Sequence, residues 1–315
     1  MLWTYSQPSS TSFPASVPYF WDAKFLSIKI SLNLIFEGRI LTGKPQDRYV
    51  DAGKPEEAAR LEAQAKAFAK VIEKELEILG LKQGMKVLDA GCGTGAVSRK
   101  IALKVSPGEV CGVDIDSLFI DEAKRLATNE GVKNVRFEFG DVNNLKYDNG
   151  TFDVSYCRLV LMHVKDPVKT VAEMKRITKR DGFVAASDND DGGILTYPAM
   201  PKLLDLWSKY GQWAKTRGED RYIGRKLFSI FSQAGLSSIS VYPFPICATQ
   251  QTPEALKMLI SVPFKIIESG KETMMNESFM TAKEYEEGMK EFPLLLNHPG
   301  AFVMGLSFLA VGKVP

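Results

Sequence analysis

The residues whose chemistry is easiest to interpret lie in one glycine-rich stretch, VLDAGCGTGAV, at residues 87–97. Asp89 precedes three glycines at alternate positions, Gly91, Gly93 and Gly95. Glycine lets the backbone approach a ligand without interference from a Cβ atom, and it allows positive φ angles. A carboxylate beside so much bare backbone predicts a nucleotide-type pocket at a turn from a strand into a helix.

Two more aspartates follow at intervals that fit the same pocket. Asp114 comes about 20 residues later, at the end of the apolar run EVCGVDI, where nucleotide-binding folds place an acid for the ribose. Asp141 ends the next apolar run, in FEFGDV, and is placed to accept from an exocyclic amine. Asp89 would attract a sulfonium or ammonium group but would repel a pyrophosphate. The three acids therefore predict a cationic cofactor that carries adenosine.

A second interpretation of the glycine turn is a dinucleotide site. Gly91-x-Gly93-x-x-Ala96 satisfies the loose dinucleotide fingerprint, and Tyr222-x-x-x-Lys226 has a spacing that some nicotinamide dehydrogenases use. That tyrosine and lysine fall well beyond the fifth predicted strand, however, on what is expected to be helix surface. A nicotinamide-dependent dehydrogenase therefore fits the sequence less well than an enzyme with a cationic cofactor.

The chain must supply a sheet to bring these residues together, and residues 85–187 alternate short apolar runs with helical stretches. Strands are predicted for KVLDAG, EVCGVDI, VRFEFGD, FDVSYCRLVL and GFVAASD. Strands that alternate with helices are joined in parallel by right-handed crossovers. The predicted fold class is therefore α/β, with a doubly wound, mostly parallel sheet and its ligand site at the carboxyl ends of the strands.

The segments around this core differ from it in pattern. An amphipathic helix is predicted from Pro55 to Leu79, because apolar residues recur there every three or four positions. The expected domain scheme is an N-terminal, disorder-like extension (1–48), a helical lid (49–84), the cofactor-binding core (85–188), a helical substrate cover (189–225), and further strands (226–315) with a helical insertion at about 252–292. The insertion forms either more of the cover or a dimer contact, so a homodimer stays open.

The composition narrows the classes of partner. The chain has 315 residues with 45% hydrophobic content, enough for a large core. Lys+Arg 40 against Asp+Glu 38 gives a formal charge of +2 without a basic stripe, which argues against nucleic acid. The apolar run FLSIKISLNLIF is too short for a transmembrane helix. The 4 cysteines form no CxxC pair, so we expect no metal site, no disulfide framework and a cytoplasmic protein.

Taken in order, the motifs resemble those of the class I S-adenosylmethionine-dependent methyltransferases, whose seven-stranded core is Rossmann-like. VLDAGCGTG resembles the glycine motif, GVDID the end of the second strand, and GDV the end of the third. FDVSYCRLVLMHV resembles the fourth strand and the helix after it, and MKRITKRDGFV the approach to the fifth, although KRDGF replaces the usual Lys-Pro-Gly-Gly turn. The resemblance implies S-adenosyl-L-methionine as cofactor and a Rossmann-like sheet with a helical cap.

The resemblance also implies roles for individual residues in cofactor binding. The segment Gly91–Gly95, with Cys92, would pass under the methionine moiety. Asp89 would orient that loop, or the cofactor's amino group through water. Asp114 would bind both ribose hydroxyls, and Ile115 would pack on the adenine.

The remaining implied contacts come from three other places. Asp141 would accept from the adenine amine beside the backbone of Val142. Cys157 and Arg158, just past the fourth strand, would lie beside the methionine part. RYVDAGKPEEAARLEAQ resembles the segment before the core in a subgroup of small-molecule methyltransferases. That likeness would add three lid contacts: Tyr49, Arg60 and Gln64.

The acceptor side of the site is less defined. Methyl transfer from a sulfonium is an in-line displacement that needs mainly alignment, so a general base matters only for a protonated acceptor. His163 and His298 are candidate bases, although histidines at such positions more often pack or cap. Asp188, with the acids at 190 and 191, follows the fifth strand toward the expected mouth and either binds the acceptor or forms a solvated turn.

The expected substrate is a small molecule. The fourth strand lacks the Asn/Asp-Pro-Pro-Tyr/Phe pattern of enzymes that methylate bases. Four aromatic residues of the cover form either core or the wall of a pocket for a partly apolar acceptor: Trp207, Tyr210, Trp213 and Tyr222. The leading hypothesis is a small-molecule methyltransferase. The alternatives are an RNA or protein methyltransferase and a cofactor-binding protein without turnover.

Overall fold

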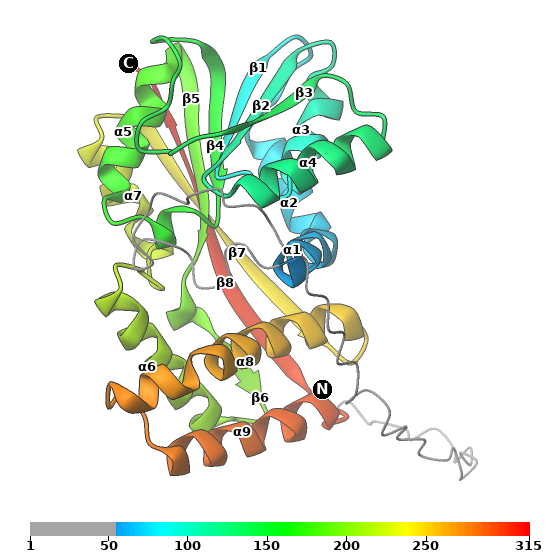
Figure 1. Ribbon diagram of the computed structural model, residues 1–315, viewed down its shortest axis with the longest axis vertical. Coiled ribbons are helices and arrows are strands. Elements are labelled where there is room, and N and C mark those ends of the chain that lie inside the picture. Colours follow the sequence, from blue (N-terminus) through cyan, green and yellow to red (C-terminus); the bar gives the residue numbers. More distant parts are fainter. Residues whose placement is uncertain (1–54) are drawn as a thin grey trace, which may run out of the picture. The chain divides into compact units, whose positions relative to one another are not determined.

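The computed structural model describes residues 55–315, so the expectations for residues 1–48 and for Tyr49 lie outside the described residues. Its centre is an eight-stranded sheet of order β3-β2-β1-β4-β5-β8-β6, in which β7 also pairs with β8 (Figure 1). The first five strands run parallel to one another: β1 (Lys86–Ala90), β2 (Glu109–Asp114), β3 (Val135–Phe139), β4 (Phe152–Arg158) and β5 (Thr178–Asn189).

This strand order creates a place for a ligand. The chain moves outward from β1 to β3 and then returns to β4, which pairs with β1 on its other side. The carboxyl ends of β1 and β4 therefore lie at the switch point, where doubly wound sheets bind ligands. The predicted doubly wound, mostly parallel α/β fold is confirmed.

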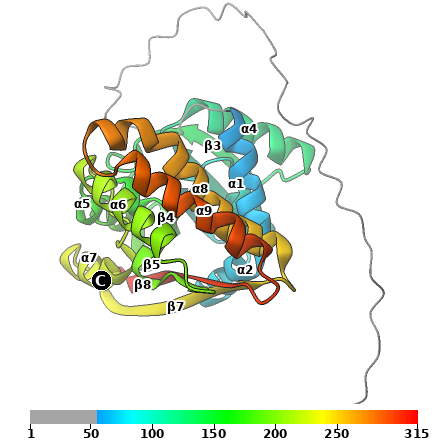
Figure 2. The ribbon, with the colours of Figure 1, turned by 90° about the horizontal axis from the view of Figure 1, so that it is seen from below.

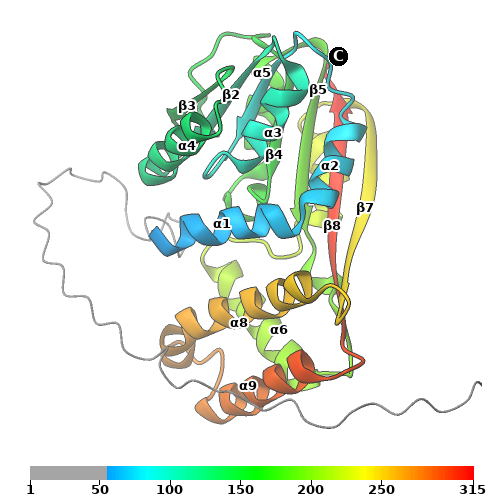
Figure 3. The same ribbon diagram turned by 90° about the vertical axis from the view of Figure 1, so that its right-hand side faces the viewer.

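The other three strands extend the sheet past these carboxyl ends. They are β6 (Leu195–Tyr197), β7 (Ser237–Thr249) and β8 (Phe302–Lys313). One half of β8 pairs antiparallel with β5, the other half pairs with β6, and β7 runs beside both halves. Figures 1 and 3 show this ribbon continuing from the parallel strands to the helices α8 and α9.

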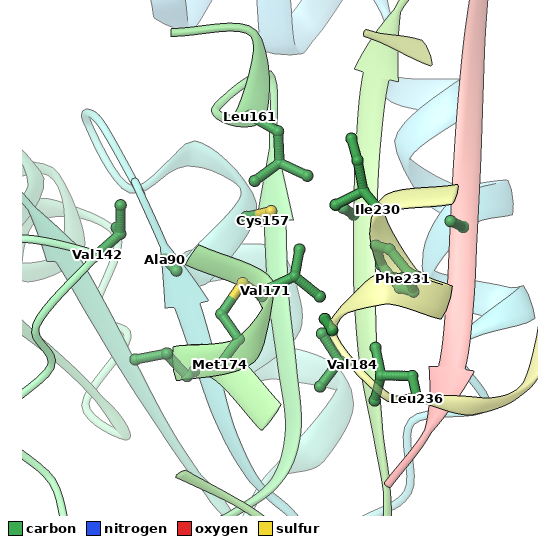
Figure 4. Close-up of a cluster of buried hydrophobic side chains, with 14 of the residues drawn as sticks. Ala90, Val142, Cys157, Leu161, Val171, Met174, Val184, Ile230, Phe231 and Leu236 are labelled. Atoms are coloured by element: carbon green, nitrogen blue, oxygen red, sulfur yellow. The ribbon is translucent and has the colours of Figure 1, made fainter. Parts of the chain in front are cut away.

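Helices cover both faces of the sheet because alternate residues of each buried strand point to opposite sides. Val87 packs with α2 (Ala69–Ile78) and α3 (Ala96–Val105), and α4 (Ser117–Asn129) lies beside them over β2 and β3. Leu88, the next residue of β1, belongs to the opposite layer, under α5 (Pro167–Ile177) and α7 (Leu227–Gln233). Figure 4 shows part of this second layer, with Met174 and Phe231 facing the strands.

A helical lobe packs against one face of the extended ribbon. It consists of α6 (Pro201–Thr216), α8 (Pro253–Asn276) and α9 (Ala282–Asn297). Figure 2 shows α8 and α9 side by side, and both contact α6. Within residues 55–315, no helix combines the length and the apolar character needed to cross a membrane.

Two details differ from the sequence-based expectations. The helix expected over residues 55–79 is two helices, α1 (Pro55–Ala67) and α2, because Phe68 leaves helical geometry at φ −101° and ψ 20°. The break lets α2 follow the sheet while α1 crosses toward α8 (Figure 3). The expected cover at 189–225 is less helical than predicted and contains the short strand β6.

Candidate functional site

The glycine turn between β1 and α3 is shaped by its three glycines. All three have positive φ, at +73° for Gly91, +52° for Gly93 and +73° for Gly95. A Cβ at Gly91 would lie 2.4 Å from Val160 Cγ2, and one at Gly95 would lie 2.5 Å from the Phe137 ring. At Gly93, within residues 55–315, the only neighbour of such a Cβ would be a methyl of Leu61 in α1, at 3.4 Å. The turn therefore presents bare backbone to the space below α1.

Asp114 is held toward this turn by two backbone amides. Gly93 N donates to Asp114 Oδ2 at 2.7 Å, and Asp116 N donates to Oδ1 at 2.9 Å. Each oxygen keeps one further lone-pair site, so the carboxylate can accept two more hydrogen bonds. Burial raises the pKa of Asp114 from its usual value. The position and the two vacant sites fit the role expected for Asp114 toward a ribose diol.

The ends of β2 and β3 present apolar side chains beside an acid. Ile115 is 65% exposed and Phe139 is 68% exposed, unusually open for such large apolar side chains. Asp141 is exposed, and its Oδ1 accepts from the Asn143 amide at 2.8 Å and from Asn143 Nδ2 at 3.0 Å. Val142 is nearly buried. Exposed apolar surface next to a hydrogen-bond acceptor fits a flat base with an exocyclic amine; the sequence reasoning missed Phe139.

Asp89 and Cys92 support the turn from below. Ser98 Oγ, in the first turn of α3, donates to Asp89 Oδ2 at 2.5 Å, and burial raises the pKa of Asp89 to about 6. The Cys92 side chain packs against the cluster that contains Ile120 and Phe137, and burial raises its thiol pKa well above the usual value. Of the two roles expected for Asp89, the geometry favours orienting the loop.

A clamp that the sequence reasoning missed fixes α1 above the turn. Thr94 Oγ1 donates to Glu62 Oε1 at 2.6 Å, and Arg99 Nη2 donates to Glu62 Oε2 at 2.8 Å. Arg99 is nearly buried and also donates from Nη1 to the carbonyl of Thr94 at 2.7 Å. The sequence did contain a signal for this clamp, because Glu62 lies between Arg60 and Gln64, the two expected lid residues of α1.

Those two expected lid residues lie on α1 as predicted. Arg60 makes two hydrogen bonds of 2.6 Å to Glu57 and one of 3.2 Å from Nη1 to Gln64 Oε1. Gln64 and Phe68 also line a cavity that reaches α6 and α8. The structure thus brings Gln64 to this cavity and pairs Arg60 within its own helix.

The end of β4 requires a correction. Cys157 and Arg158 lie within β4, not past it, and their side chains point to opposite faces of the sheet. Cys157 is fully buried in the layer under α5, so its side chain is core (Figure 4). The Arg158 Nε donates at 3.1 Å to Glu75 of α2, which is also fully buried and accepts from Tyr156 at 2.9 Å and from Ser187 at 2.6 Å.

A cavity of about 130 Å³ lies between the sheet ends and the helical lobe. Gln64, Arg158 and Asn189 line it from the side of the glycine turn, and mostly apolar residues of α6, α8 and β8 form the rest of the wall. Of the four aromatic residues proposed for a pocket, only Trp207 lines this cavity. Tyr210 stacks on Trp207 with ring centroids 5.1 Å apart and belongs to the core of the lobe.

The candidate catalytic residue Asp188 also requires a correction. It lies inside β5, fully buried, and its Oδ2 accepts from Leu161 N at 3.0 Å, so it holds the short helix after β4 rather than facing the mouth. Burial raises the pKa of Asp188 to about 7. The next two acids do line the cavity: Asp190 is paired with Arg225, and Asp191 is paired with Arg221 at 2.8 Å.

Neither candidate histidine lines the cavity. His163 Nδ1 lies 3.6 Å from Glu219 Oε2, in the short helix Leu161–His163. His298 follows α9, accepts from Gly300 N at 3.1 Å through Nδ1 and meets the Tyr197 ring edge-on. These contacts are typical of packing and capping, as the sequence analysis considered for both residues.

Known proteins that resemble the chain share this architecture. Residues 81–235 match a family model described as a methyltransferase domain. An uncharacterized methyltransferase of Schizosaccharomyces pombe is 32% identical over 38% of the chain and 45% of its own length. The demethylmenaquinone methyltransferase of Staphylococcus saprophyticus is 26% identical over 58% of the chain and 81% of its own length. The chain spans only about half the length of two of its curated relatives, 45% and 56%.

Solved structures agree on the fold. The phosphoethanolamine N-methyltransferase 2 of Haemonchus contortus superposes with a TM-score of 0.55 at 18% identity, over 86% of the chain and 60% of its own. The family match covers the glycine turn, the three strand-end acids and all five parallel strands. Residues 81–235 thus match a methyltransferase domain, and the chain has the Rossmann-like fold of its methyltransferase neighbours.

Proposed function

We propose that the chain transfers a methyl group from S-adenosylmethionine to a small-molecule acceptor. The observation that carries the proposal is the position of Arg158 between two sites. Arg158 is close enough to Asp89, under the glycine turn, to lower the pKa of that acid, and it also lines the cavity. A cofactor on the turn and an acceptor in the cavity would therefore meet at this residue.

The chain's own residues would hold the cofactor at its adenosine end. Bound S-adenosylmethionine supplies a methyl group on an electrophilic sulfonium. Asp114 would accept from the ribose hydroxyls through its two vacant lone-pair sites, and Asp141 would accept from the adenine amine. Ile115 and Phe139 would cover the base, which would remove their exposed apolar surface from water.

The acceptor half of the site would mainly align the two reactants and remove water from around them. Most of the cavity wall is apolar, so a bound acceptor that fills the cavity would displace water from it. Alignment of two bound reactants can supply about 7–11 kcal/mol of a barrier. A volume of about 130 Å³ favours a small acceptor over RNA or protein. The name of the demethylmenaquinone relative also supports a small-molecule acceptor.

Calorimetric titration with S-adenosylmethionine tests this proposal. We expect the wild type to bind, and Asp114→Ala to bind roughly tenfold to a hundredfold more weakly, as for the loss of hydrogen bonds to a charged group. Asp121→Ala, an exposed position on α4, is the matched control and should bind like the wild type. Thermal unfolding of each variant checks that it is folded.

Two results would count against the proposal. Absence of binding by the folded wild type would refute the cofactor assignment, and an unchanged affinity of Asp114→Ala would refute the ribose contact. Incubation of the wild type with methyl-labelled cofactor and a metabolite extract then tests turnover. Label found in a small organic product supports the proposal, whereas label found in protein or RNA contradicts it.

A further inference from the structure

We infer that the cavity binds a ring-sized apolar acceptor that carries oxygen, hydrogen-bonded to the Trp207 indole and the Thr196 hydroxyl. This inference rests on the proposed methyl transfer and names the chemical class of its acceptor. Thr196 lies in β6 and Trp207 in α6, and both side chains line the cavity.

The cavity contains two buried polar atoms without a partner. Within the described residues, neither Trp207 Nε1 nor Thr196 Oγ1 has a hydrogen-bond partner of good geometry. Trp207 is only 7% exposed. Buried polar atoms in folded proteins are almost always paired, so an unpaired one calls for an explanation. The other indole of α6 is paired, since Trp213 Nε1 donates to Glu277 at 2.8 Å. Of the two buried indoles of α6, only the one that lines the cavity has no such partner within the described residues.

The chemistry of the two atoms determines which ligand group can form hydrogen bonds with them. An indole N–H only donates, and a threonine hydroxyl both donates and accepts. The ligand group must therefore accept from Trp207, which an oxygen does and an ammonium group cannot. Asp191 lies close enough to the indole for the Trp207 N–H to lower the pKa of its carboxyl group, and Asp191 Oδ2 already accepts from Arg221 Nε at 2.8 Å. A hydroxyl oxygen fits best, because it can accept from Trp207 and still donate to Thr196 or Asp191.

The size and wall of the cavity define the rest of the ligand. A volume of about 130 Å³ is close to that of an engineered apolar cavity, about 150 Å³, that holds benzene. Leu204, Leu259 and Val303 are among the apolar residues of the wall. One aromatic or alicyclic ring with a hydroxyl group matches both the volume and the surface.

A pair of probes that differ only by a hydroxyl group tests the inference. Binding of p-cresol and of toluene to the protein without cofactor would be measured by ligand-observed NMR titration. We expect the wild type to prefer p-cresol. We expect Trp207→Phe and Thr196→Val each to weaken p-cresol binding by roughly threefold to tenfold, as for one neutral hydrogen bond, and to leave toluene binding unchanged.

Two further variants control for folding and for location. Trp213→Phe removes an indole N–H from the same helix but outside the cavity wall, so it should leave both probes unaffected. Gly305→Val fills the cavity from β8. A Cβ at Gly305 would meet Leu259 Cδ2 at an ordinary 3.6 Å, and a β-branched side chain suits a strand. It should abolish binding of both probes while the protein stays folded.

The outcomes separate this inference from the proposed function. Absence of probe binding to the wild type, equal affinity for both probes, or unchanged p-cresol affinity in both Trp207→Phe and Thr196→Val would overturn the inference. None of these results depends on S-adenosylmethionine, so the proposed methyl transfer would stand if cofactor binding were observed. Conversely, p-cresol binding without any cofactor binding would refute the proposed methyl transfer, whereas the inference about the ligand of the cavity would stand.

Discussion

Three aspartates of the sheet have their pKa raised by the same cause, burial, and yet they have different tasks. Asp89 accepts from Ser98 and fixes the start of α3. Asp114 accepts from two backbone amides and keeps vacant sites for a ligand. Asp188 accepts from Leu161 N and supports the short helix after β4. Its role is therefore structural, and the pH dependence of stability can test it.

The sign of that dependence follows from the pKa of Asp188. Burial raises it from 3.8 to about 7 in the folded protein, so between these values the unfolded chain binds fewer protons than the folded chain. Stability then falls as pH rises through this window. Asp188→Asn removes the titration and keeps an oxygen that can accept from Leu161 N. We expect its free energy of unfolding to fall less steeply from about pH 4 to pH 7 than that of the wild type.

Asp153→Asn is a useful control for this measurement. Partial burial opposes ionization of Asp153, but hydrogen bonds from Lys179 and from the Lys86 amide lower its pKa below 3.8. Its contribution to stability is therefore lost at a pH below the window of Asp188, and the slope above pH 4 should match the wild type. Parallel pH profiles for Asp188→Asn and the wild type, measured by urea denaturation, would contradict the assignment.

At the scale of elements, the sequence predicted the parallel strands well, but it predicted helix breaks and side-chain directions less well. Short apolar runs between helical stretches identify buried strands directly, and the acids at the ends of β2 and β3 are where the pattern placed them. The spacing of apolar residues does not reveal the helix break at Phe68, because Phe68 itself continues the helical spacing on both sides. The side-chain direction at Cys157 depends on a register of one residue, which local pattern does not determine.

The clamp on α1 leads to a prediction for that helix. Glu62 links α1 to Thr94 and Arg99 beside the glycine turn. Glu62→Ala removes both contacts and leaves the nearly buried Arg99 without that carboxylate. We expect amide hydrogen exchange to become faster in residues 55–67, because local opening of α1 costs less free energy, and to stay unchanged in the sheet.

Glu73→Ala is the matched control for the clamp. Glu73 is exposed on α2, outside both contacts to the turn, so its removal should leave the exchange of α1 as in the wild type. Exchange would be followed by mass spectrometry at several labelling times. Equal exchange of residues 55–67 in Glu62→Ala and Glu73→Ala would show that apolar packing, rather than Glu62, holds α1 in place.

At the scale of the whole described unit, one feature connects the parallel core to the helical lobe, and a second fixes a side chain at the cavity between them. One is β8, which pairs with β5 in the core and with β6 in the lobe. The other is Glu75, which joins α2 to Arg158 on β4 and to Ser187 on β5. Because Arg158 lines the cavity, Glu75 also determines where that guanidinium lies.

The free energy of unfolding tests how strongly this second connection holds. Glu75 is fully buried, and it holds the pKa of Arg158 high by its negative charge against the effect of burial. Glu75→Gln leaves the buried Arg158 uncompensated, and such a change typically costs about 3–5 kcal/mol. Glu77→Gln changes an exposed position that pairs with Lys74, and it should cost less than about 1 kcal/mol.

A double-mutant cycle distinguishes charge compensation from loss of packing. If Glu75 mainly neutralizes Arg158, the double variant Glu75→Gln/Arg158→Gln loses both charges together. Its free energy of unfolding should then be reduced by less than the sum of the two single changes, since residues in direct contact are not additive. Additivity within about 0.5 kcal/mol would instead mean that Glu75 acts through Tyr156 and Ser187. The attachment of α2 to β4 and β5 would then depend on hydroxyl groups rather than on the ion pair.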